Sequence, residues 1–281
     1  MLSEAFLRRL EGMQLRMRAP AQGGAGGLRR SRALGSSVEF SDFREYAAGD
    51  DLRRVDWNAY ARFDRLFLKL FMEEQETQVN ILLDDSASMA PKWTLAQDLA
   101  QLFACLALRG GDRVTLYALG GGHCDGLHGR AGMLRAAEFL EKQAPHGEVR
   151  LCDALPRLPL RGGRGVCLLL TDLLSPDGYE TGLQSLLYRR QEAELLHLLS
   201  PEELDPPLNG MLRLIDSETG EARELLVNAG MLADYRRALD GLCRGAEAFC
   251  HGREVPYLLL TSGLDVEGQA LRELAKIGIV G

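Results

Sequence analysis

The sequence has no long apolar run and no pair of cysteines at the spacing of a zinc site. No segment reaches the roughly 18 consecutive apolar residues of a membrane-spanning helix, and residues 1–20 carry charges where a signal peptide needs an apolar stretch. We therefore expect a cytoplasmic protein without a membrane segment. The cysteines are scattered and include no Cys-x-x-Cys motif, which favours reduced thiols over disulfides. They are Cys105, Cys124, Cys152, Cys167, Cys243 and Cys250.

Several motifs of common enzymes are also missing. There is no Gly-x-Ser-x-Gly sequence, which argues against a serine hydrolase. The glycines of residues 22–27 are not followed by Lys-Ser or Lys-Thr, so they predict a flexible linker and not a phosphate loop. Asp125 stands where a dinucleotide fingerprint beginning at Gly120 needs its third glycine. The crowded residues His123, Cys124, Asp125 and His128 lack a second ligand pair at zinc spacing and predict a solvated turn.

The net charge of −7 is unevenly distributed along the chain. Residues 1–35 contain seven arginines and two glutamates, a balance of +5, which leaves −7 − 5 = −12 for the remainder. A basic arm could contact nucleic acid or anionic lipid, or it could contact its own acidic domain or a protein partner. We favour contact with the chain's own acidic domain or with a protein partner. We expect no nucleic acid, because an acidic body repels phosphate backbones.

The hydrophobic pattern predicts an α/β fold with a doubly wound, mostly parallel sheet and an N-terminal extension. Apolar strand-like runs at 79–83, 114–119, 166–170, 193–199 and 257–260 alternate with amphipathic helical patterns. Residues 211–215 and 224–227 are predicted to form a hairpin. We divide the chain into an N-terminal helix and basic arm (1–35), a polar and aromatic segment (36–76) and the main domain (77–281). A helix is expected over residues 3–17.

The segment 36–76 packs charges of both signs around aromatic residues. One interpretation is an ion-paired brace, in which Arg44, Arg53 and Arg62 pair with Glu39, Asp50 and Asp56 while Trp57 fills the core. The other is a catalytic or partner-binding face, since structural ion-pair networks and functional sites gather charges in the same way.

Small oxygen-bearing side chains follow two of the apolar strands. Asp84, Ser86 and Ser88 come directly after the strand at 79–83, and Asp172 follows the strand at 166–170. If these strands are parallel neighbours, all four side chains emerge at the carboxyl edge of the sheet, where α/β proteins bind ligands. Carboxylates and hydroxyls are hard oxygen ligands suited to Mg²⁺. The alternative is a structural loop, with Ser86 and Ser88 capping the next turn and Asp84 accepting backbone N–H groups.

These residues carry a resemblance to a known family. Asp84-x-Ser86-x-Ser88 with a later Thr-Asp resembles the metal-ion-dependent adhesion site of von Willebrand factor A domains. The preceding segment resembles bacterial proteins of the domain-of-unknown-function family 58 (DUF58) over about residues 35–90 and more loosely beyond. The matching signature residues include Arg44, Tyr46, Asp50, Asp51, Arg53, Asp56, Trp57 and Arg62.

The resemblance implies a Rossmann-like von Willebrand A fold and a non-catalytic adaptor. Such proteins are often encoded beside a MoxR-type AAA+ ATPase and are thought to assist assembly or maturation of client complexes. In the family site, a partner's carboxylate completes the coordination of the metal. One departure weakens the metal prediction: no Ser or Thr occurs between Thr115 and Thr171, and Val149 stands about where the family has a ligating threonine.

Two functions therefore stand at this point. The first is an adaptor whose sheet edge binds a partner, with Mg²⁺ held by Asp84, Ser86, Ser88 and Asp172. The second is a metal-dependent phosphohydrolase or nuclease using Asp84 and Asp172 with a water nucleophile, and with Glu39 or Asp50 as general base. We favour the first, because neither motif places a His or Lys beside its aspartate.

Overall fold

The computed structural model describes Phe6, Leu10, Met13, Leu15, residues 39–46, 55–63, 65–72, 77–160 and 164–280. The chain divides into two compact units, the first formed by residues 1–31 and 77–281 and the second by residues 32–76. The predicted helix at 3–17, apart from the four residues above, and the linker at 22–27 lie outside the described residues.

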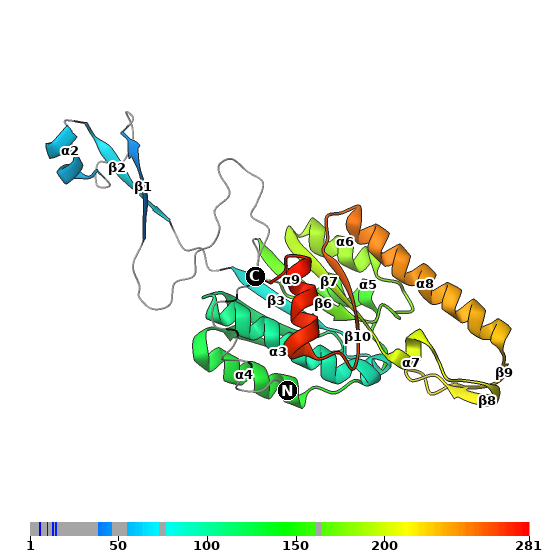
Figure 1. Ribbon diagram of the computed structural model, residues 1–281. Coiled ribbons are helices and arrows are strands. Elements are labelled where there is room, and N and C mark those ends of the chain that lie inside the picture. Colours follow the sequence, from blue (N-terminus) through cyan, green and yellow to red (C-terminus); the bar gives the residue numbers. More distant parts are fainter. Residues whose placement is uncertain are drawn as a thin grey trace. The chain divides into compact units, whose positions relative to one another are not determined.

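The first unit is built on one six-stranded sheet (Figure 1). Its strand order is β10-β7-β6-β3-β4-β5, with every neighbouring pair parallel except β4 and β5. The strands are β3 (Gln78–Leu83), β4 (Arg113–Ala118), β5 (His123–Leu127), β6 (Gly165–Thr171), β7 (Gln191–Leu199) and β10 (Tyr257–Thr261). The prediction of a mostly parallel α/β sheet is confirmed.

The central strands form where the apolar runs lie, because a strand covered by helices on both faces has no polar side. The predicted pairing of β3 with β6 is confirmed, with Leu82 opposite Leu169 and Leu83 opposite Leu170. The chain proceeds from β3 outward to β4 and β5, and then crosses to β6 on the other side of β3. The carboxyl ends of β3 and β6 therefore mark the point where the strand order reverses, which is the usual ligand site of open α/β sheets.

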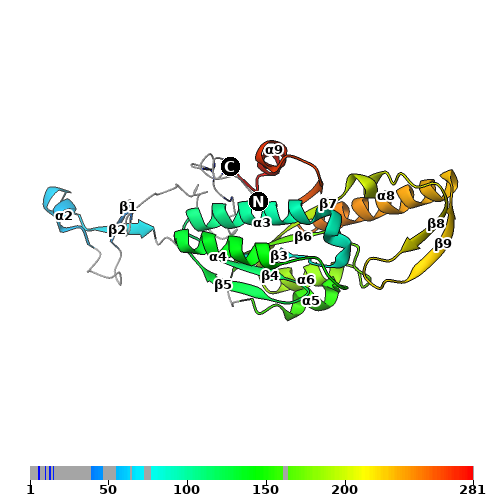
Figure 2. The same cartoon turned by 90° about the horizontal axis from the view of Figure 1, so that it is seen from below.

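Helices cover both faces of the sheet (Figure 2). The helices α3 (Trp93–Arg109), α4 (Gly129–Lys142) and α9 (Leu271–Lys276) pack with Ile81 and Leu83 in one apolar cluster. The helices α5 (Leu151–Arg157), α6 (Glu180–Tyr188) and α8 (Ala229–His251) pack with Leu82 and Leu169 in the other. Alternate residues of each strand therefore enter opposite cores, as the pleat of a strand requires. No helix among the described residues is long and apolar enough to cross a membrane.

One part of the first unit differs from the prediction, one adds to it and one agrees with it. Residues 123–127 form the antiparallel edge strand β5, so the predicted solvated turn there is wrong; Leu127 is buried and anchors the strand. A short helix, α7 (Pro201–Leu204), follows β7. The predicted hairpin is present as β8 (Gly210–Ile215) and β9 (Ala222–Val227), a separate two-stranded sheet.

The described residues of the second unit form a small antiparallel sheet and a helix. Strand β1 (Glu39–Glu45) pairs with β2 (Phe67–Met72), and α2 (Trp57–Phe63) lies between them in sequence. The carboxylate of Asp56 accepts hydrogen bonds from the N–H groups of Asn58 and Ala59 and so caps α2. Trp57 is 60% exposed and contacts Tyr60 edge to face, so the prediction that it fills the core is wrong.

The extreme N-terminal residues that the structure describes belong to the core of the first unit. Phe6, Leu10 and Leu15 are buried in the same apolar cluster as Ile81 and Leu83. Leu15 also forms an isolated antiparallel bridge with Val280. The two ends of the chain are thus joined through one hydrophobic core.

Candidate functional site

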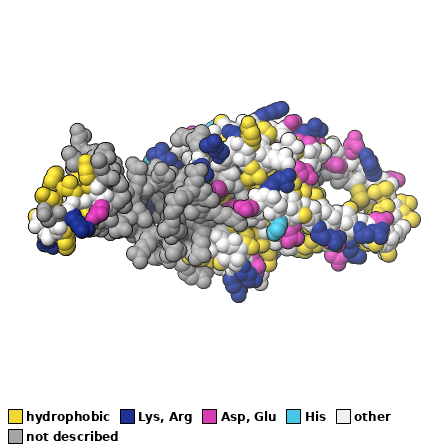
Figure 3. All heavy atoms as spheres, turned by 90° about the horizontal axis from the view of Figure 1, so that it is seen from above, with side chains coloured by type: hydrophobic (Ala, Val, Ile, Leu, Met, Phe, Trp, Pro, Cys, Tyr) yellow, Lys and Arg dark blue, Asp and Glu magenta, His cyan; other side chains and the backbone are white. Residues whose placement is uncertain are grey.

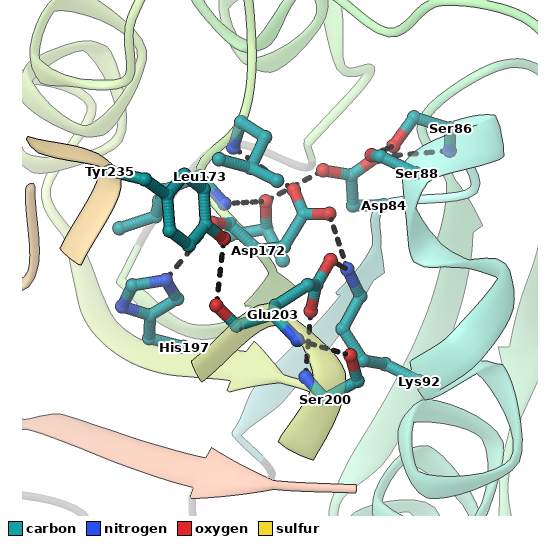
Figure 4. Close-up of polar contacts among 12 residues, drawn as sticks. Asp84, Ser86, Ser88, Lys92, Asp172, Leu173, His197, Ser200, Glu203 and Tyr235 are labelled. Carbon is teal, nitrogen blue, oxygen red and sulfur yellow. Dashed lines mark hydrogen bonds and ion pairs between the residues drawn. The ribbon is translucent and has the colours of Figure 1, made fainter. Parts of the chain in front are cut away.

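The candidate site begins where the chain leaves β3 and β6. The N–H of Asp84 donates to the carbonyl of Leu170 at 3.0 Å, which continues the β3–β6 pairing by one residue. The Asp84 carboxylate then accepts two hydrogen bonds, from the N–H of Ser86 at 3.0 Å and from the hydroxyl of Thr171 at 2.6 Å. Asp84 and the Thr171–Asp172 pair therefore meet at one edge of the sheet (Figure 4).

Ser86 and Ser88 lie beside the Asp84 carboxylate and point their hydroxyls toward it (Figure 4). The two hydroxyl oxygens are 3.0 Å apart and share a hydrogen bond. Ser86 is buried, and Ser88 is partly exposed at the start of a 3-10 helix (Ala87–Lys92). The Ser86 hydroxyl does not cap this helix, contrary to the structural alternative, so both hydroxyls remain directed at the site.

A buried lysine neutralises the charge of Asp172. The Lys92 ammonium lies 2.9 Å from Asp172 Oδ2 and also contacts the Glu203 carboxylate. Glu203 in turn forms a capping box with Ser200 at the start of α7, since each side chain bonds to the backbone N–H of the other residue. The other Asp172 oxygen accepts a hydrogen bond from the N–H of Leu174 at 2.9 Å.

A buried histidine lies behind Asp172. His197 on β7 donates from Nε2 to the backbone carbonyl of Asp172 at 2.9 Å and accepts from the Tyr257 hydroxyl at Nδ1, also at 2.9 Å. Burial lowers the pKa of His197 to about 4, so its ring is neutral near pH 7. Neither sequence motif contains a Lys or His beside its aspartate, but Lys92 and His197 reach Asp172 from other parts of the chain.

The Asp84 carboxyl is placed where its charge is costly. Its side chain is 2% exposed, and burial, together with the nearby Asp172 charge, raises its pKa to about 6. Hydrogen bonds from Thr171 and Ser86 act in the opposite direction. Lys92 contacts Asp172 and not Asp84, so among the described residues Asp84 has no ion-pair partner.

The loop of residues 144–150 borders the site on the side of β4. The carbonyl of Gly147 accepts from the N–H of Ala87, and the N–H of His146 donates to the carbonyl of Asp85. Val149 is buried in an apolar cluster with Leu82 and offers no side-chain oxygen. Asp85 turns toward the loop after β4, where its carboxylate accepts from the N–H of Gly120, and burial raises its pKa.

These residues fit a divalent cation in part. Ser86 and Ser88 place two hydroxyl oxygens beside the buried Asp84 carboxylate, which has no counter-charge among the described residues. These are three hard oxygen donors, and Mg²⁺ readily keeps waters in its remaining positions. Asp172 is less available, because the buried Lys92 ammonium already neutralises its charge. Within the part of the chain that the structure describes, no three His, Cys, Asp or Glu side chains form a metal cluster. A cation here would thus rely on Asp84, hydroxyls and water.

The signature segment is not placed relative to this site. Asp50, Asp51 and Arg53 lie outside the described residues, and so does the side chain of Arg44. Tyr46 is partly exposed, and Arg62 is exposed on α2. The ion-paired brace and the partner-binding face both remain predictions. The ion pair that the structure describes in the second unit joins two other residues, Arg65 and Glu45, at 3.0 Å.

Sequence reasoning did not identify Lys92, Glu203 or His197 as members of the site. Lys92 follows Pro91 directly, and a lysine flanked by Ala90, Pro91 and Trp93 was a usable signal. His197 within the apolar strand β7 was another, because a histidine there needs polar partners. Glu203 gave a local signal only, the Ser200-x-x-Glu203 capping box.

The sheet order and the polar edge define an α/β protein with a cluster of polar side chains at its topological switch point. The chain belongs to the family described as protein of unknown function DUF58, whose sequence pattern matches residues 42–240. This confirms the family that the signature residues indicated.

Relatives with similar sequences are known in mycobacteria. The uncharacterized protein Mb1516 of Mycobacterium bovis is 27% identical over 257 residues, which covers 86% of this chain and 80% of that protein. The uncharacterized protein Rv1480 of Mycobacterium tuberculosis has the same identity and coverage.

Solved structures with a similar arrangement come from Bacteroides. The conserved hypothetical protein BatB of Bacteroides thetaiotaomicron is 17% identical, with a TM-score of 0.41, and the match covers 72% of this chain and 98% of that one. An aerotolerance-related membrane protein of Bacteroides fragilis is also 17% identical, with a TM-score of 0.42 and coverage of 71% and 97%.

Proposed function

We propose that this protein is a non-catalytic adaptor that binds a partner at the carboxyl edge of its sheet. In this proposal Asp84, Ser86 and Ser88, with a smaller contribution from Asp172, hold a divalent cation such as Mg²⁺. An acidic side chain of the partner completes the coordination of that cation. The partner predicted from the family resemblance is a MoxR-type AAA+ ATPase or its client complex, and the proposed location is the cytoplasm.

The observation that carries the proposal is the environment of Asp84. A buried carboxylate without a counter-charge destabilises the folded state unless something else compensates it. Asp84 stands beside two hydroxyls at the sheet edge, and the outer one, Ser88, is partly exposed. A cation bound from solvent would supply the missing positive charge, and it would leave a coordination position open to a second protein.

The same contacts favour binding over hydrolysis. His197 uses both ring nitrogens in hydrogen bonds, and Lys92 is buried in contact with two carboxylates. Neither side chain is therefore positioned to act as a general base, that is, to accept a proton from a water held by Asp84 and Asp172. Of the bases considered for hydrolysis, Asp50 and the side chain of Glu39 lie outside the described residues.

The test is capture of the purified MoxR-type ATPase of the same host by the full-length protein. Asp84→Ala should reduce capture at least tenfold, and EDTA should reduce capture by the parent to a similar level. Asp240→Ala, which removes an exposed carboxylate on α8, is the control and should bind like the parent. If Asp84→Ala captures the ATPase as well as the parent does, with and without EDTA, the edge is not the docking site.

A further inference from the structure

The two faces of the hairpin β8–β9 differ in burial. The hairpin lies outside the six-stranded sheet, beside the first part of α8 (Figure 1, Figure 2). Because side chains alternate along a strand, Leu212, Leu225 and Val227 share one face, where they are half-buried or buried. Leu214 and Arg223, on the same face but nearer the turn, are exposed. The opposite face, which we call the outer face, is exposed along its whole length and consists of Met211, Arg213, Ile215, Ala222, Glu224 and Leu226.

Three large apolar side chains of the outer face contact solvent. Met211 is 71% exposed, Ile215 64% and Leu226 57%. An antiparallel sheet with one solvated face normally carries polar residues on that face, so this arrangement needs an explanation. The hairpin is also a sheet of two strands only, and such a sheet is marginally stable in water unless something packs on it. Exposed apolar side chains gathered in this way mark a surface that binds another protein.

The outer face also carries one pair of opposite charges in its middle. Arg213 and Glu224 are direct cross-strand neighbours, and both are exposed. The ion pair that the structure describes in this hairpin joins two other residues, Arg223 and Glu221, at 3.7 Å. Within the described part of the chain, Arg213 and Glu224 form no ion pair. Both charges are therefore available to a surface with the opposite pattern.

The register of the hairpin makes the outer face complementary to itself. Its cross-strand pairs are Met211 with Leu226, Arg213 with Glu224 and Ile215 with Ala222. A two-fold rotation about an axis parallel to the strands lays β8 of one copy over β9 of a second copy. Each Arg213 then faces Glu224 of the other copy, and the large Ile215 faces the small Ala222. An axis in the same plane but perpendicular to the strands would place Arg213 over Arg213, which like-charge repulsion disfavours.

We propose that the protein forms a symmetric dimer in which the outer faces of two β8–β9 hairpins pack on each other. The dimer buries the three apolar side chains of each copy and pairs each Arg213 with Glu224 of the other copy. The occupant of the outer face is thus a second copy of this chain. This surface is separate from the sheet edge at Asp84 and does not depend on a cation there. A dimer carries two such edges, so a partner that reaches both is bound more tightly than by one alone.

Sedimentation velocity of the full-length chain over a series of concentrations measures the dimer. The buffer contains EDTA, so the result is independent of the proposed cation site. Arg213→Glu and Glu224→Arg should each raise the Kd of the dimer about tenfold or more, because each places two like-charged pairs across the interface. The double variant Arg213→Glu/Glu224→Arg restores opposite charges and should return the Kd to within about threefold of the parent. Arg223→Glu, the same reversal on the other face of the hairpin, is the matched control and should stay within about twofold.

Each outcome decides for or against this dimer. Because Arg213 and Glu224 are exposed, their variants should fold like the parent, and the double variant shows directly whether a loss comes from charge or from misfolding. A parent that stays monomeric at about 1 mM would overturn the proposal. So would a dimer that tolerates both single reversals, because its interface would then lie elsewhere. A double variant that dimerises no better than the single variants would contradict the pairing of Arg213 with Glu224.

Discussion

Asp84 is an ionised group held where its charge lowers the stability of the fold. Its pKa of about 6 lies above the ordinary 3.8 because burial and the nearby Asp172 disfavour the charged form. The shift corresponds to about 3 kcal/mol at pH values above 6, where the folded state must carry the charge, and to nothing below 3.8. A group kept under such a penalty is a common feature of binding sites.

Asp84→Asn should therefore stabilise the metal-free protein while it weakens cation binding. In EDTA at pH 7.5, we expect the free energy of unfolding to rise by about 1–3 kcal/mol, because the amide removes a buried charge of nearly the same shape. Urea denaturation measures this change, and the gain should shrink as the pH falls from 6 toward 4. Asp240→Asn on exposed α8 should change stability by less than about 0.5 kcal/mol. A less stable Asp84→Asn protein would contradict the assigned penalty.

His197 should give a pH dependence of the opposite sign. Its folded pKa of about 4 lies below the unfolded value of 6.5, so the unfolded state binds the proton more readily between these values. Lowering the pH from 7 to 4 should reduce the stability of the parent relative to His197→Gln by about 3 kcal/mol. Both proteins keep Asp84, so its effect cancels in the difference. A difference that is constant across this range would show that His197 titrates normally.

At the level of residues, sequence patterns predicted the side chains that directly follow β3 and β6, but not those that other segments bring to the site. Asp84, Ser86, Ser88 and Asp172 were predictable because each follows an apolar strand within a few positions. Lys92 and Glu203 were not, because their roles depend on tertiary contacts between residues that are 80 or more positions apart. Such contacts leave no local pattern.

The packing of α6 on α5 depends on a close approach of backbone to backbone. A Cβ atom added at Gly182 would lie 2.7 Å from the carbonyl oxygen of Leu151, so α6 can reach α5 only with glycine at this position. Both helices cover the face of the sheet that contains Leu82 and Leu169. Val149, two residues before the start of α5, is buried in the same cluster.

Gly182→Ala should separate these two helices and destabilise the protein by about 1–3 kcal/mol, the usual cost of overpacking a core. Gly241→Ala is the matched control, because Gly241 lies in α8 with nothing within 4 Å of an added Cβ. Alanine favours the helix, so Gly241→Ala should stabilise the protein by up to about 1 kcal/mol. Thermal unfolding of the two variants should shift in opposite directions, and equal shifts would show that the contact with Leu151 is not limiting.

Elements with strong periodicity were predictable, and short or polar elements were not. The continuous apolar runs of β3 and β6 clearly indicate strands, and the long amphipathic stripe of α8 clearly indicates a helix. Strand β5 was missed because its glycine and histidine content resembles a turn, and its pairing with β4 supplies the stability that its composition lacks. The predicted burial of Trp57 failed because an aromatic residue among charges has no periodic pattern that sets its direction.

At the scale of the whole molecule, the face that Figure 3 shows does not carry a single sign of charge. On the face of the molecule seen in Figure 3, basic and acidic side chains are interspersed over the coloured part. The strong negative balance of the chain beyond residue 35 is therefore not gathered into one patch on that face. A localised site at the sheet edge, and not a general electrostatic surface, is the basis of the proposed binding.

The described N-terminal residues pack in the same hydrophobic core as the sheet of the first unit. The stability of the sheet therefore depends on a segment that is distant from it in sequence. Leu10 is fully buried in the cluster that contains Ile81 and Leu83 of β3, the strand that ends at Asp84. Leu10→Ala should lower the free energy of unfolding by about 2–5 kcal/mol, the range for a large core residue cut to alanine. Leu134→Ala, at a position that is 67% exposed on α4, is the control and should have little effect. Because the buried segment and the sheet share one core, urea denaturation of Leu10→Ala should show one transition at lower urea with an unchanged slope. A separate early transition, or no change, would show that the N-terminal residues pack on the sheet without supporting it.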